Sequence, residues 1–175
     1  MSDSLVMIIG IILAAILMFI FPMMTLAERN DDVTQLAVYT ATADFVDSVS
    51  SKGVITNDEY SAFIQTLSAT GNLYDIDIQI YNLDENVGKK VSWTEGTVIG
   101  ENGYTVDHTT QVMKDLDLDG ARPLKEGDKV SVTVKNTNTT LAQMLRSFLY
   151  KLTGTSPYEI YAEHTRVVTS TGRTL

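Results

Sequence analysis

The sequence predicts an α+β fold in which a long N-terminal helix packs with further helices on a small, mainly antiparallel sheet. Three observations support this prediction. An apolar segment opens the chain, a long stretch without Pro or Gly follows it, and two later stretches alternate apolar and polar residues. The first two patterns are typical of helix, and the third is typical of strands with one buried face.

The apolar segment covers residues 5–24, which are twenty consecutive apolar, Gly or Pro positions. Twenty helical residues rise about 30 Å, the hydrocarbon thickness of a bilayer. We therefore assign residues 1–27 to a transmembrane anchor. A signal peptide cleaved after Ala27 is the alternative, because residues 25–27 form a passable cleavage site. We favour the retained span, because no Lys or Arg precedes it and signal cores are usually shorter, roughly 7–15 residues.

Residues 28–52 continue the same helix as an amphipathic half. Nothing between residues 28 and 51 is Pro or Gly, and apolar side chains recur at every fourth position from Val33 to Val49. A kink is permitted at Pro22, and Gly53 is in a helix-stop position. The pattern predicts one rod with a membrane half and a second half that has its own packing face.

Within the span, Gly, Ala and Pro interrupt the large apolar side chains. Small residues allow two helices to approach closely in a bilayer or a filament core. We therefore expect an assembly face that joins these positions to the stripe of the second half. Its members are Gly10, Ala14, Ala15, Pro22, Val33, Ala37, Ala41, Phe45 and Val49.

Residues 53–175 are expected to form one α+β head. A capping box at Thr56 and Glu59 begins a helix that stops near Gly71, and Thr139 or Thr140 caps a later one. The predicted strands are residues 74–80, 90–93, 97–99, 104–106, 129–135 and 158–169, and a short helix covers 109–116. The core stripe of the last helix is expected to be Leu141, Leu145, Phe148 and Leu152.

The composition limits the partners. Residues 28–175 hold all 13 basic and 21 of the 22 acidic residues, a net charge of −8, which argues against nucleic acid as a partner. The chain has no Cys, which excludes disulfides and thiolate metal sites. No nucleophile elbow, phosphate loop or zinc helix is present, so we expect no enzymatic activity, no required cofactor and no small-molecule substrate.

One acidic segment matches the template of a calcium loop. Three carboxylates at alternate positions, a glycine and a later glutamate have the required spacing. The ligands would be Asp115, Asp117, Asp119, the carbonyl of Ala121, and Glu126. Arg122 and Pro123 depart from the template, so we favour an acidic surface turn and keep a lone calcium loop as a second hypothesis.

The chain is predicted to consist of an anchor, a rod and a compact head, in that order. Four segments of the rod and head carry a further likeness to a known family, and they are residues 43–49, 53–60, 67–76 and 127–130. On these features the chain resembles the TadE-like pseudopilins of Flp/Tad-type pili from Gram-positive bacteria. The resemblance implies a single-pass structural subunit in the cell membrane, with its head extracytoplasmic. Its expected partners are the bilayer, other pilin-like subunits and secretion-system membrane proteins.

Pilin families of this kind carry an acidic residue near the start of the apolar helix and a Gly before the processing site. In this chain the nearest acid is Asp3, and no such Gly precedes it, which favours a minor or accessory subunit. The alternative function is a single-pass anchored binding or sensory module, stabilised by calcium. In that case the rod would act only as a tether.

Overall fold

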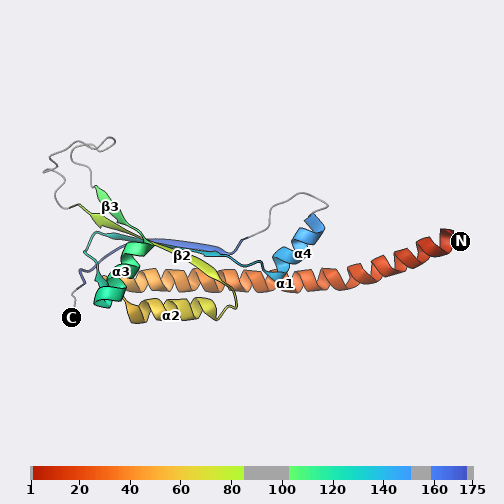
Figure 1. Cartoon of the computed structure of the whole chain (residues 1–175), viewed down its shortest axis with the longest axis horizontal. Helices are drawn as coiled ribbons and strands as arrows, with labels where there is room; N and C mark the ends of the chain where they lie inside the picture. The colour runs from red at the N-terminus through yellow and green to blue at the C-terminus, as the bar shows by residue number, and fades with distance from the viewer. Residues whose placement is uncertain (1, 85–102, 151–158, 173–175) are drawn as a thin grey trace.

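A computed structural model describes residues 2–84, 103–150 and 159–172 of the chain (Figure 1). Its longest element is helix α1, Ser2–Lys52, which runs for 51 residues through Pro22 without a break. At 1.5 Å per residue this rod is about 75 Å long. Its N-terminal half extends beyond the head and curves gently, as Figure 1 shows. The prediction of a single continuous rod is confirmed.

Two elements follow α1 and reverse the chain. Strand β1, Val54–Thr56, leads into helix α2, Asn57–Ser68, which packs beside α1. The predicted helix start at Thr56 is confirmed, because the Glu59 amide donates to Thr56 Oγ1 at 3.3 Å, which is one of the two bonds of a capping box. Gly53 has a φ of +70°, and a Cβ there would lie 2.0 Å from the carbonyl oxygen of Ser170. A glycine at this position therefore allows both the turn and the close approach of the C-terminal segment.

The main sheet has four antiparallel strands in the order β3-β2-β5-β6. Its strands are β2, Tyr74–Leu83; β3, Tyr104–Asp107; β5, Lys129–Asn136; and β6, Tyr161–Val167. The predicted α+β class and antiparallel sheet are confirmed. The strands expected at 90–93 and 97–99 lie outside the described residues.

Helix α3, Thr109–Asp119, follows β3, and helix α4, Leu141–Tyr150, follows β5. The three-residue strand β4, Ala121–Pro123, pairs with β1 in a second, two-stranded sheet. The expected core stripe of α4 is wrong at Leu141, which is 50% exposed, whereas its neighbours Ala142 and Gln143 are buried. The side chains of Phe148 and Leu152 lie outside the described part of the chain.

The core forms where the second half of α1 lies along β5 and β6. Val38, Val46 and Val49 of α1 are fully buried there, together with Val132 and Val134 of β5. Residues 28–52 are therefore part of the head's own core. The buried line of α1 also contains small and polar side chains, which are Ala27, Asp31, Thr34, Thr42 and Ser50.

This packing predicts that replacing two valines of the same helix by alanine will have very different effects on the free energy of unfolding. Val38→Ala removes buried methyl groups and should lower the free energy of unfolding by about 2 kcal/mol. Val33→Ala, at a position 62% exposed, should change it by less than about 0.5 kcal/mol. Urea unfolding of the full chain in detergent micelles measures both. A larger effect at Val33 would mean that the opposite face of α1 packs on the sheet.

Candidate assembly and membrane-attachment surface

The N-terminal half of α1 has the properties of a membrane-spanning helix. Its most apolar 18-residue window has a mean hydropathy of 3.0, and none of that window is buried in the fold. Within the described residues, α1 alone is long and apolar enough to cross a membrane. This is compatible with a single-pass anchor, and a signal sequence meets the same criterion.

Pro22 lies in the exposed part of this helix. Proline has no amide hydrogen, so one bond of the backbone ladder is missing at this position. One turn later, the Thr25 hydroxyl donates to the carbonyl of Phe21 at 3.1 Å, an additional local bond beside the proline. A polar side chain near the end of the span is thus satisfied within its own helix.

The small residues of the span face open space. Gly10, Ala14 and Ala15 are all exposed, and a Cβ added at Gly10 would meet nothing within 4 Å. Gly10 and Ala14 are four positions apart and therefore share one face of the helix. Glycine inside a helix costs about 1 kcal/mol relative to alanine. Nothing within the chain's own described fold requires Gly10, whereas a closely packed second helix would.

In the second half of α1, some residues of the expected assembly face are exposed and others are buried. The prediction is corrected for the buried ones. Val33 and Ala37 are exposed and Ala41 is half-buried, but Phe45 is 6% exposed and Val49 is fully buried. The last two side chains pack within the head, so they do not belong to the exposed part of the face. The correction follows from the fold, because the sheet and α2 cover the last turns of the rod on more than one side.

An apolar stripe remains on the uncovered side of α1. It consists of Leu26, Val33 and Leu36, which are 70%, 62% and 66% exposed. Their spacing of seven and three residues places them on one side of the helix. We call these three residues the outward stripe. It continues the apolar surface of the span along the rod and beyond Glu28, the first charged residue after the span.

Helix α4 is fastened to α1 where the span ends. The Thr140 hydroxyl donates to the Asp31 carboxylate at 2.6 Å, and both side chains are buried. The same hydroxyl accepts the amide of Gln143 at 3.2 Å, so Thr140 both caps α4 and binds α1. Arg146 donates from Nε to Glu28 at 2.9 Å. The sequence predicted the cap, but it gave no sign of the partner on α1.

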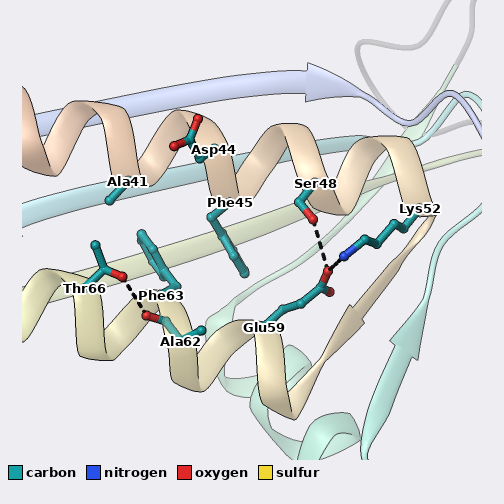
Figure 2. Close-up of a pocket in the computed structure, with 9 residues that line it drawn as sticks. All are labelled: Ala41, Asp44, Phe45, Ser48, Lys52, Glu59, Ala62, Phe63 and Thr66. Atoms are coloured by element: carbon teal, nitrogen blue, oxygen red, sulfur yellow. Dashed lines mark hydrogen bonds and ion pairs between the residues drawn. The ribbon is translucent and has the colours of Figure 1, made fainter.

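A shallow groove lies between α1 and α2 (Figure 2). Phe45 and Phe63 stack in it with their ring centroids 4.5 Å apart. At one end, Glu59 accepts hydrogen bonds from Lys52 and from Ser48, the latter at 3.1 Å. Burial disfavours the charged form of Glu59, but these hydrogen bonds outweigh it and lower its pKa. These bonds join the last turns of α1 to the first turn of α2.

The residues of the calcium template do not form a loop. Asp115, Asp117 and Asp119 all lie in α3, and Gly120, with a φ of +71°, ends that helix. Alternate positions of a helix point about 200° apart, so adjacent carboxylates of this set diverge. Asp115 is instead paired with Arg122, which also binds Asp107.

The structure therefore does not arrange Asp115, Asp117, Asp119, Ala121 and Glu126 as one loop, and calcium binding stays a prediction. In the part of the chain that the structure describes, no three acidic or histidine side chains gather as a metal site would need. The template was matched in sequence only, because the helix continues through the positions where a loop was required.

Comparisons with known protein families, curated proteins and solved structures find no match for this chain. The function must therefore be inferred from the geometry of the chain itself. That geometry consists of an uncovered apolar helix, small residues on its surface, an outward stripe beyond the span, and a head fastened to the end of the span.

The joint between α4 and α1 generates a prediction. Thr140→Val removes the cap of α4 and the hydrogen bond to buried Asp31, at an expected cost of about 1–3 kcal/mol. Amide hydrogen exchange should become faster in α4 and stay nearly unchanged in β2. Thr139→Val, at the exposed neighbouring position, is the matched control and should have little effect. Equal exchange in the two variants would show that the joint does not hold α4.

Proposed function

We propose that the protein is a membrane-anchored, pilin-like structural component of a Flp/Tad-type pilus or a related secretion assembly. The main support is the difference between the two halves of helix α1. The second half of α1 builds the core of the head, while its first half extends beyond the head with its apolar side chains uncovered. The similarity to TadE-like pseudopilins in the segments named above supports the same proposal and favours an extracytoplasmic head.

The uncovered half of α1 must be covered by something other than water. Full burial of a Leu, Ile or Phe side chain gains about 1.5–3 kcal/mol, and the span carries many such side chains at 47–77% exposure. Exposed apolar surfaces of this extent mark membrane or protein contacts. Lipid covers this surface in the isolated subunit, and the helices of other subunits replace the lipid on assembly.

The outward stripe supports an assembly role over a simple tether. A tether needs apolar side chains only as far as the bilayer reaches. Leu36 lies twelve residues beyond Met24, which corresponds to about 18 Å along the helix axis. Val33 and Leu36 are nevertheless 62% and 66% exposed. A second helix packed along this side of α1 would cover these side chains.

The alternative is an anchored binding module that uses the groove between α1 and α2. Its stacked phenylalanines give it an apolar floor, but its volume of about 280 Å³ is at the lower limit of ligand pockets. Two of its three charged groups, Lys52 and Glu59, are also bound to each other. The assembly role therefore has the stronger support.

Crosslinking tests the assembly role. The chain has no cysteine, so each introduced thiol is the only one. Ala14→Cys, in the span, and Ala37→Cys, beside the outward stripe, should each give adducts with a second copy or a partner when cells are treated with a short bismaleimide. Leu118→Cys on α3 is the control, because this position is 71% exposed and lies on a different element.

Adducts at Ala14 and Ala37 but not at Leu118 support an assembly face along α1. Monomer alone at both α1 positions would contradict the proposal. Equal adduct formation at all three positions would also contradict it, because random collision rather than a defined face would then explain the products.

A further inference from the structure

The head has a second apolar surface at the end from which the span emerges. Four large side chains of it are exposed: Leu26 at 70%, Leu73 at 69%, Leu141 at 50% and Met144 at 54%. We call them the membrane-proximal patch. They come from three separate elements, which are the end of the span in α1, the turn before β2, and α4.

Hydrogen bonds and a shared cavity bring these elements together. Leu26 and Leu141 line the same cavity, of about 490 Å³, together with Met23 of the span. The amide of Leu73 donates to Asn138 Oδ1 at 2.8 Å, and its carbonyl accepts the amide of Thr137 at 2.8 Å. Leu73 is thereby fixed beside the segment that leads into α4. Met144 lies one turn after Leu141 on the exposed side of α4.

The patch lies at the level where the bilayer should end. Leu26 is two residues beyond Met24, which is about 3 Å along the helix axis. The bonds from Thr140 to Asp31 and from Arg146 to Glu28 hold α4 at the next turns of α1. In Figure 1, α4 rises from α1 toward the side on which the N-terminal half projects. Lipid that surrounds the span therefore reaches the patch directly.

The charges near the patch suit contact with uncharged lipid. Glu28 is paired with Arg146, and Asp31 is buried and accepts a hydrogen bond from Thr140, so neither carboxylate is left exposed without a partner. The net charge of −8 on residues 28–175 opposes attraction to anionic lipid. Hydrophobic contact is therefore the driving force.

We propose that the membrane-proximal patch rests on the bilayer surface and inserts Leu73, Leu141 and Met144 into the interfacial region. This inference rests on the proposed membrane anchoring of α1. Two points of attachment, the span and the patch, fix the tilt of the rod and the rotation of the head about it. Each subunit then presents its outward stripe in the same orientation before assembly.

Site-specific fluorescence of the full chain in phosphatidylcholine vesicles tests this proposal. An environment-sensitive fluorophore is attached to single cysteines at Met144 and Leu73 in the patch, at Met18 in the span, and at Leu118 on α3. Met18 and Leu118 are matched controls, at 77% and 71% exposure in the isolated chain. Two quenchers are compared, one attached to the lipid chains and one dissolved in water.

We expect the lipid-attached quencher to reduce emission at Met144, Leu73 and Met18, and the aqueous quencher to reduce emission at Leu118. With Leu141→Asp, the aqueous quencher rather than the lipid-attached one should reduce the emission of the fluorophore at Leu73. Adding anionic lipid to the vesicles should not increase lipid quenching at the patch. Lipid quenching at Met18 with aqueous quenching at both patch positions would overturn the patch contact and leave the anchor intact. Aqueous quenching at Met18 would overturn the anchor, and the patch contact with it.

Discussion

The packing of one face of α1 on β5 and β6 is the interaction on which the rest of the structure depends. Val38, Val46 and Val49 are fully buried in that contact, within the same core as the valines of β5. Because an unbroken helix is a stiff rod, fixing its second half also sets the direction in which its first half leaves the head. The span, the outward stripe and the membrane-proximal patch all owe their positions to this contact. Helix α2 packs beside the same half of α1 through the stacked Phe45 and Phe63.

The polar residues in the buried face of α1 make the contact specific. A buried carboxylate without a partner would be costly, so Asp31 favours the one arrangement in which Thr140 reaches it. Thr42 satisfies its own hydroxyl by donating to the carbonyl of Val38 at 2.7 Å. An entirely apolar face could pack in several registers, whereas the bond between Thr140 and Asp31 fixes the position of α4 at the end of the span. The head and the apolar half of α1 are thus coupled at this joint.

Local signals in the sequence were sufficient to predict most elements of the fold. The long rod, the helix start at Thr56, and the alternating strands β2 and β5 are each encoded by neighbouring residues. The buried face of the rod was not predictable in this way. Thr34, Thr42 and Asp31 interrupt its apolar periodicity, and the partner of Asp31 lies 109 positions away. Phe45 and Val49 were assigned to an assembly face for the same reason. The pairing of β1 with β4 was missed because each strand has only three residues. The sequence also did not show that α3 extends through the calcium template.

The central claim is that both halves of α1 remain joined in the working protein. Intact-mass analysis and N-terminal sequencing of the protein purified from its source cells test this claim most directly. The account predicts a chain in the membrane fraction that begins within residues 1–4, with a mass close to 19.3 kDa. A chain that begins at Glu28 and is recovered in the medium would contradict it, because the span would then be a removed signal and the head a free secreted domain.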